Sequence, residues 1–322
     1  MIKLAHRLVL TEKCNFSCPH CFNANERMSG IMDADILLEF MRKNKHHLDT
    51  YSLKLMGGEP TLHPRFMEIF KEACKHYGEV YLFTNGSTMK DIANDPIILK
   101  NHLMGRVIYV INGFTFNLEK FEEYRDFINI VSLHFVVPME NVETMIDKVI
   151  KCFDFQPNIN LVISPDTQVN LFDEDTLNEY RSVWMKAITT LVPKIRLRGM
   201  PYIYDHVLPI CFYNQEMLDY LHSYDIDNIH TLKITCCGDQ QLGLIDHNFD
   251  IYYCNQTRIK IGSLLNEVGQ PKILSEVEVM LQAGSSIKTE AIKNECEKCS
   301  KCPVVASCKV GCYYNTLVKS NE

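Results

Sequence analysis

The chain has 322 residues, of which 46% are hydrophobic and 23% charged, proportions that exclude a disordered or fibrous protein. Its formal net charge of −7 argues against a nucleic-acid binder, and no apolar run is long enough to cross a membrane. Charged residues interrupt the N-terminal apolar stretch too early for a signal peptide, so we expect a cytoplasmic protein that binds neither nucleic acid nor membrane.

The first half of the chain alternates strand-like and helix-like segments. Apolar patterning predicts six strands, at residues 3–10, 51–56, 80–83, 107–111, 131–137 and 159–163. Helical periodicity covers residues 33–46 and 142–153, and a third helix is expected to start near Pro64. This order predicts parallel βαβ units and an α/β fold. Polar or glycine residues end these strands, so we expect them on the carboxyl-terminal rim, where α/β barrels hold active sites.

The regularity fades after about residue 195. Short strand-like or helix-like pieces remain at residues 218–224, 242–245, 251–254 and 273–281, and residues 246–248 resemble a hairpin turn. We therefore expect a domain boundary near residues 195–210. The predicted domains are a core over residues 1–200 and a smaller domain over residues 201–322.

Cysteine is unusually frequent, with 14 residues. In a reducing cytosol so many cysteines indicate metal binding or catalysis rather than a disulfide framework. Three cluster near the N-terminus at Cys14, Cys18 and Cys21, and five cluster near the C-terminus at Cys296, Cys299, Cys302, Cys308 and Cys312.

The first cluster has the spacing CxxxCxxC and follows the first predicted strand. Three thiolates on one loop bind three corners of an iron–sulfur cube and leave the fourth iron to another ligand, whereas a structural zinc site needs four protein ligands. This spacing resembles the radical S-adenosylmethionine (radical SAM) superfamily over about residues 3–200. Gly57-Gly58-Glu59-Pro60 resembles the superfamily's GGE motif, and Thr84-Asn85-Gly86 after the third strand also matches.

The resemblance implies a partial (β/α)6 TIM-like barrel with a [4Fe–4S] cluster held by Cys14, Cys18 and Cys21. That cluster binds S-adenosylmethionine (SAM) and cleaves it reductively to methionine and a 5′-deoxyadenosyl radical. By the same resemblance, the SAM-binding residues are expected to be Gly57, Gly58, Glu59 and Pro60 at the methionine, His20 and Phe22 at the adenine, and Asn112 at the ribose.

The C-terminal cysteines resemble the SPASM extension, which binds auxiliary [4Fe–4S] clusters in radical SAM enzymes. One cluster is expected to use Cys296, Cys299, Cys302 and Cys308, with Cys296 replacing the last cysteine of the family pattern. Cys312 would cross to a second cluster together with Cys254 and one or both of Cys236 and Cys237. A single auxiliary cluster, as in the shortened twitch variant, and a zinc ribbon remain the alternatives.

Other cysteines are interpreted individually. Cys74 and Cys152 lie among apolar residues at helical spacing and are expected to be small buried hydrophobes. For Cys211 three interpretations stay open, namely a core residue, a cluster ligand, and a catalytic thiol that faces the substrate and donates a hydrogen atom.

SPASM-type enzymes mostly modify peptides, so we expect a maturase (RiPP maturase) that abstracts hydrogen from a ribosomally made precursor peptide and installs a crosslink. Alternatives are an aminoglycoside-type small-molecule dehydrogenase, a sulfatase-maturating enzyme and, outside enzymology, an iron–sulfur electron carrier or zinc-ribbon protein. The first strand begins near residue 3, so we expect leader recognition by a separate protein or direct recognition of the substrate. The chemistry implies a flavodoxin- or ferredoxin-type reductant.

Overall fold

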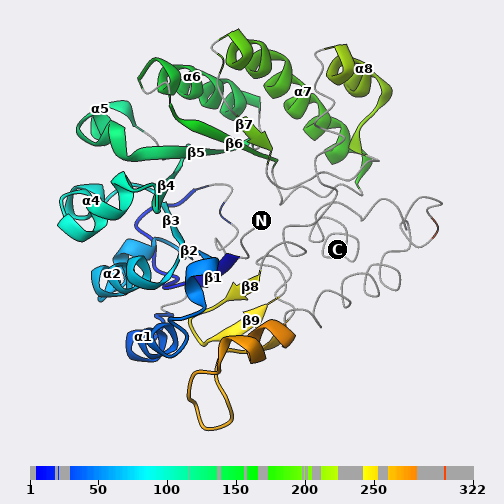
Figure 1. Cartoon of the computed structure of the whole chain (residues 1–322). Coiled ribbons are helices and arrows are strands. Elements are labelled where there is room, and N and C mark those ends of the chain that lie inside the picture. Colours follow the sequence, from blue (N-terminus) through cyan, green and yellow to red (C-terminus); the bar gives the residue numbers. More distant parts are fainter. Residues whose placement is uncertain are drawn as a thin grey trace. The chain divides into compact units, whose positions relative to one another are not determined.

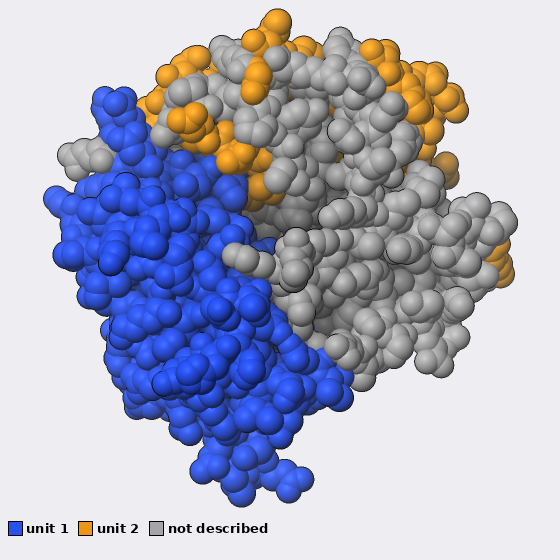
Figure 2. Space-filling model, in the orientation of Figure 1, with its two compact units in different colours: residues 1–131, 240–284 blue, residues 132–239, 285–322 orange. Residues whose placement is uncertain are grey.

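The structure is a computed structural model that describes residues 5–18, 21, 30–115, 117–135, 139–155, 158–165, 173–197, 199, 202–204, 212–223, 242–252, 260–280 and 301. The chain divides into two compact units, residues 1–131 with 240–284 and residues 132–239 with 285–322 (Figure 2). The expected division into functional domains near residue 200 stays a prediction.

Strands and helices alternate along the first half of the chain (Figure 1). The strands are β1 (Ala5–Val9), β2 (Ser52–Met56), β3 (Glu79–Thr84), β4 (Val107–Asn112), β5 (Ile128–Phe135), β6 (Asn160–Pro165), β7 (Tyr202–Tyr204), β8 (Leu242–Ile245), β9 (Asp250–Tyr252) and β10 (Lys260–Ser263). The α-helices are α1 (Ala34–Lys43), α2 (Phe66–His76), α3 (Met89–Ala93), α4 (Pro96–Leu103), α5 (Leu118–Phe121), α6 (Met139–Phe155), α7 (Glu174–Leu197) and α8 (Gln215–Ser223). Three short 3₁₀ helices are η1 (Leu48–Thr50), η2 (Pro60–Leu62) and η3 (Glu122–Phe127). All six predicted strands are confirmed, and the helix expected from Pro64 begins two residues later, at Phe66.

Strands β1 to β4 pair in parallel, in chain order, as the sequence predicts. The register aligns Val9 with Met56 and Thr84 with Ile111, so the carboxyl ends of these strands lie along one edge. Strand β8 pairs in parallel with the other side of β1, and β9 and β10 continue the sheet in antiparallel order. The α/β prediction is confirmed, with a sheet that stays open like a partial barrel.

Helices α1 and α2 lie side by side, and α2 also contacts β3 (Figure 1). The carboxylate of Asp33 begins α1 by accepting hydrogen bonds from the backbone N–H groups of Asp35 and Ile36, which have no partner within the helix. The apolar stripes of both helices are buried, including Phe40 of α1 and Phe70 of α2, and burying each such side chain stabilises the unit by about 1.5–3 kcal/mol.

The β8–β9 hairpin has the turn expected at residues 246–248, closed by the hydrogen bond from Asp246 N to Asp250 O (3.0 Å). Phe249 adopts a positive φ of 64°, a conformation that favours glycine and costs a larger residue about 1–2 kcal/mol. Its side chain is buried, and this apolar burial offsets the backbone cost.

The second unit contains β6 and β7, which pair in parallel. The longest helix that the structure describes in this unit is α7, which no expectation from the sequence covered although Tyr180, Trp184 and Leu191 recur at helical spacing and are buried. Within the described part of the chain, no helix is both long and apolar enough to span a bilayer.

Candidate functional site

A loop that follows β1 carries Cys14, Cys18 and Cys21. A backbone hydrogen bond from Glu12 N to Gly30 O (3.0 Å) joins the two ends of this loop. None of the three cysteines forms a disulfide, and each is half-buried. The loop therefore presents three partly accessible thiols from a fixed base.

The donor set of this cysteine loop fits an iron–sulfur cluster by its chemistry. Three thiolates on one loop can each bind a different iron of a cubane cluster and leave the fourth iron to another ligand. Among the residues that the structure describes, no three His, Cys, Asp or Glu side chains form a site for a single metal ion.

Gly57 and Gly58 bring the end of β2 into direct contact with the base of the cysteine loop. Gly58 N donates a hydrogen bond to Thr11 O (2.8 Å), and Glu59 N donates one to Lys13 O (2.7 Å). A Cβ atom at Gly57 would lie 2.3 Å from Thr11 O, and one at Gly58 would lie 2.4 Å from Lys13 O. Because both obstacles are backbone atoms, only glycine allows this approach.

The Glu59 carboxylate is fully buried and links β2 to β3. Its Oε1 accepts hydrogen bonds from Thr84 Oγ1 (2.8 Å), Thr61 Oγ1 (2.7 Å) and Thr61 N (3.3 Å), and its Oε2 accepts one from Asn85 N (2.7 Å). Burial raises the pKa of this carboxyl, and the hydrogen bonds from Asn85, Thr61 and Thr84 partly offset that rise. The structure thus gives Glu59 a positioning role, and its contact with the ammonium group of a ligand stays a prediction.

Two asparagines at neighbouring strand ends lie next to the cysteine sulfurs. Asn85 Nδ2, just after β3, lies 4.0 Å from Cys14 Sγ, and Asn112 Nδ2, at the end of β4, lies 3.9 Å from Cys18 Sγ. The structure therefore brings Asn112 to the site, although its predicted contact with a ribose is untested. Asn85 was missed as a site residue, and its position directly after a strand in Thr84-Asn85-Gly86 was the available signal.

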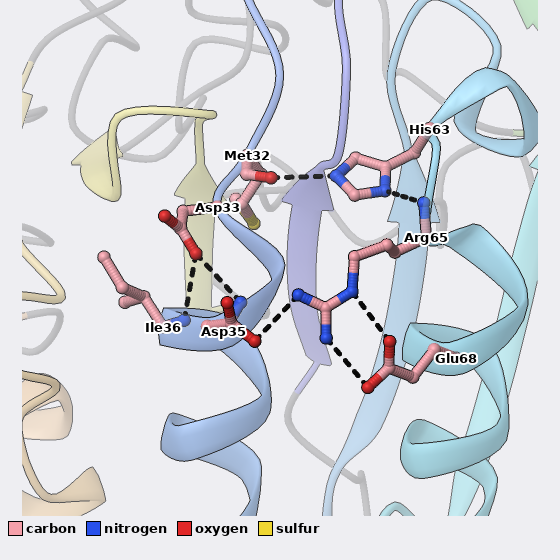
Figure 3. Close-up of polar contacts among 7 residues, drawn as sticks. All are labelled: Met32, Asp33, Asp35, Ile36, His63, Arg65 and Glu68. Carbon is pink, nitrogen blue, oxygen red and sulfur yellow. Dashed lines mark hydrogen bonds and ion pairs between the residues drawn. The ribbon is translucent and has the colours of Figure 1, made fainter.

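His63 joins the segment that follows Glu59 to the segment that precedes α1. Its Nδ1 accepts a hydrogen bond from Arg65 N (3.1 Å), so Nε2 carries the proton and donates to Met32 O (2.8 Å) (Figure 3). The Arg65 guanidinium then contacts Asp35 at the start of α1 and Glu68 in α2. The segment that follows Glu59 is thereby fixed to the segment that returns from the cysteine loop.

The remaining predicted residues divide into two groups. Pro60 is buried and begins η2. Cys74 is buried in α2, which confirms the prediction of a small buried hydrophobe, and burial raises the pKa of its thiol to about 12. The side chain of Cys152 in α6 lies outside the described part. So do the predicted site residues His20, Phe22, Cys211, Cys236, Cys237, Cys254, Cys296, Cys299, Cys302, Cys308 and Cys312.

Residues 8–155 match the radical SAM superfamily. This part of the chain is a radical SAM domain. The matched range contains the cysteine loop, Gly57 to Pro60, and both asparagines. A radical SAM domain implies a [4Fe–4S] cluster that binds SAM, in agreement with the donor set of the loop.

The curated proteins that match this domain are named for different activities. The chain is 34% identical over 86 residues to the tungsten-containing aldehyde ferredoxin oxidoreductase cofactor-modifying protein of Pyrococcus furiosus, covering 26% of this chain and 24% of that protein. It is 38% identical over 90 residues to a probable GTP 3′,8-cyclase of Saccharolobus islandicus, covering 27% and 29% of the two chains. A probable GTP 3′,8-cyclase of Saccharolobus solfataricus is 32% identical over 152 residues, which cover 42% of this chain and 49% of that protein. The chain thus spans between a quarter and a half of the length of these relatives.

The fold is similar to that of a solved protein across nearly the whole chain. Streptococcus suis SuiB bound to S-adenosylmethionine superposes with a TM-score of 0.60 at 16% identity, covering 98% of this chain and 74% of SuiB. SuiB bound to the precursor peptide SuiA gives a TM-score of 0.57, with 98% of this chain and 72% of SuiB covered. At this level of identity the likeness shows the fold alone.

Proposed function

We propose that this radical SAM protein cleaves SAM reductively and uses the resulting radical to install a crosslink in a ribosomally made precursor peptide. The observation that carries the proposal is the packing of the cysteine loop against Gly57 and Gly58 within one radical SAM domain. When bound, the cluster and SAM supply a 5′-deoxyadenosyl radical that removes a hydrogen atom from the substrate.

The residues of the site have separable roles in this proposal. Cys14, Cys18 and Cys21 bind three irons and leave the fourth accessible to the amino and carboxylate groups of SAM. The backbone from Gly57 to Pro60 binds the methionine portion, and it is held in place by the buried carboxylate of Glu59. His20 and Phe22 would contact the adenine.

Two observations support a peptide substrate. SuiB, whose structure with its precursor peptide SuiA is known, shares its fold with 98% of this chain. The cysteines from Cys296 to Cys312, together with Cys254 and Cys236 or Cys237, have the SPASM-type spacing that occurs mostly in peptide-modifying enzymes. We accordingly propose one or two auxiliary [4Fe–4S] clusters, with a precursor peptide, a separate leader-binding protein and a flavodoxin- or ferredoxin-type reductant as partners.

A second candidate is the conversion of a small molecule such as a nucleotide. It is favoured by the probable GTP 3′,8-cyclases, which are 32–38% identical to parts of this chain. Those alignments cover only 27–42% of the chain, whereas the likeness to SuiB extends over 98% of it. The peptide substrate is therefore the primary proposal.

The substrate class is tested by anaerobic incubation of the reconstituted chain with SAM, dithionite and either GTP or short peptides encoded beside the gene. The proposal predicts a peptide that loses hydrogen and shifts in mass, in amounts that match the deoxyadenosine formed. Formation of deoxyadenosine with unchanged peptide masses and conversion of GTP would favour the second candidate.

Cluster number is tested on the same preparations by iron and sulfide analysis. Two auxiliary clusters predict about twelve irons per chain, which fall to about eight when Cys14, Cys18 and Cys21 are replaced by alanine. Cys74→Ala is the matched control, because it removes a buried thiol away from the site and leaves the iron content unchanged. About four irons accompanied by zinc would contradict the auxiliary clusters.

A further inference from the structure

We infer that Asn85 and Asn112 donate hydrogen bonds to the thiolates of Cys14 and Cys18 and thereby raise the reduction potential of the cluster that these cysteines hold. The inference rests on the cluster of the proposed function and concerns residues of this chain outside the CxxxCxxC motif. Two separate contacts carry it, 4.0 Å from Asn85 Nδ2 to Cys14 Sγ and 3.9 Å from Asn112 Nδ2 to Cys18 Sγ.

The orientation of both amides is fixed by the backbone. Asn85 Oδ1 accepts a hydrogen bond from Ser87 N (2.9 Å), and Asn112 Oδ1 accepts one from Phe114 N (2.9 Å), each two residues along the chain. A backbone N–H can donate only to the carbonyl oxygen of the side-chain amide and not to its NH₂ group, so these turns determine which end of each amide is the carbonyl. The NH₂ group is consequently the end that faces the sulfur in both cases.

Further contacts hold Asn85 in this position. Its backbone N–H donates to Glu59 Oε2 (2.7 Å), and its Nδ2 also donates to Asn15 Oδ1 (2.8 Å) from within the cysteine loop. The Thr115 hydroxyl lies 3.2 Å from Asn85 O and 3.1 Å from Asn112 O, which joins the two strand ends. The two donors are therefore parts of one rigid arrangement around the loop.

Hydrogen bonds to cluster sulfurs are one of the factors that set iron–sulfur reduction potentials. An N–H dipole that points at a thiolate stabilises negative charge, so it favours the reduced cluster, which carries one more electron, over the oxidised cluster. At about 4 Å each contact is long, and we expect each to contribute a modest positive shift of the potential. Together they ease electron transfer from a ferredoxin- or flavodoxin-type reductant.

The test is a redox titration, in the absence of SAM, of the EPR signal that disappears when all three loop cysteines are replaced by alanine. Asn85 and Asn112 are each replaced by alanine, which removes the donor, and by aspartate, which keeps the Oδ1 acceptor of the turn but directs a negative oxygen at the sulfur. Asn94→Asp is the matched control, because Asn94 follows α3 and its side chain bonds only to Lys90 O among its described contacts.

We expect a lower midpoint potential in every Asn85 and Asn112 variant, lower for aspartate than for alanine, and an unchanged potential in Asn94→Asp. Two substitutions at each position ensure that a variant with poor cluster loading does not decide the result. Loaded variants with the wild-type potential would overturn the inference while the cluster itself stands. Absence of the signal from the wild-type chain would overturn the proposed function and the inference with it.

Discussion

Replacement of Glu59 by alanine tests whether this buried carboxylate holds the end of β2 against the end of β3. In the wild-type chain it accepts hydrogen bonds from Asn85 N and Thr84 Oγ1, and both donor residues are themselves buried. The alanine variant leaves these two donors without that acceptor. Each buried unsatisfied donor costs about 1–3 kcal/mol, so the free energy of unfolding should fall by about 2–6 kcal/mol.

The glutamine variant separates the hydrogen bonds from the charge. A carboxamide at position 59 keeps an oxygen for Asn85 N, and its NH₂ group then faces the Thr84 and Thr61 hydroxyls, which rotate to accept. Thr61 N loses its acceptor, and so do the hydroxyl hydrogens of Thr61 and Thr84, but Thr61 is half-buried and water replaces the acceptor there. We expect a cost of about 1–3 kcal/mol, mainly from the buried Thr84 hydroxyl, which is smaller than the cost of the alanine variant.

Urea unfolding followed by circular dichroism measures both variants, since linear extrapolation gives the free energy of unfolding in water. Glu68→Ala is the control, because it breaks an exposed ion pair with Arg65, and solvent-exposed ion pairs contribute little to stability. If Glu59→Ala costs no more than Glu59→Gln or than the control, the buried hydrogen bonds do not hold the two strand ends together.

Three further changes test neighbouring contacts. Gly58→Ala places a Cβ atom 2.4 Å from Lys13 O and must displace the cysteine loop, so bound iron after reconstitution should fall by up to about four irons per chain, and unchanged iron would contradict the close approach. His63→Ala removes the hydrogen bond to Met32 O and should destabilise the chain by about 1–3 kcal/mol, seen as a lower Tm, whereas an unaltered Tm would exclude the bracing role. Burial raises the pKa of Glu72, but hydrogen bonds from its basic neighbours outweigh burial and lower it to about 2. Its stabilising contribution is therefore present above the unfolded pKa and is lost as the pH falls from about 5 toward 2, so Glu72→Gln should flatten that decline, and parallel pH curves for the two proteins would refute it.

The part of the fold that sequence patterns predict is the part formed by local signals. Strands β1 to β4 are short apolar runs, and each is followed by the polar or glycine residues that meet in the site. Parallel strands joined by right-handed crossovers place these carboxyl ends on one edge, so the meeting of Cys14, Gly58 and Asn112 follows from chain order. The spacing of the cysteines and the Gly-Gly-Glu-Pro sequence predicted the [4Fe–4S] cluster and SAM as the bound groups.

Long-range contacts are the part that sequence patterns miss. Strand β8 pairs with β1 although more than 200 residues separate them, and no periodicity in either strand encodes its partner. The positive φ of Phe249 is rare for a bulky residue, so the residue type gave no signal of this backbone conformation. The contact between Asn85 and Cys14 depends on how the turn after β3 folds, which residue type alone does not reveal.

In the proposed function, the cysteine loop and the adjoining strand ends form a centre that cleaves SAM. The most direct measurement is the 5′-deoxyadenosine formed from SAM and dithionite under anaerobic conditions, by the wild-type chain and by the variant in which Cys14, Cys18 and Cys21 are alanine. Deoxyadenosine is expected from the wild type and from Cys74→Ala, and none is expected from the triple variant. Equal amounts from the triple variant and the wild type, or none from an iron-loaded wild type, would contradict it.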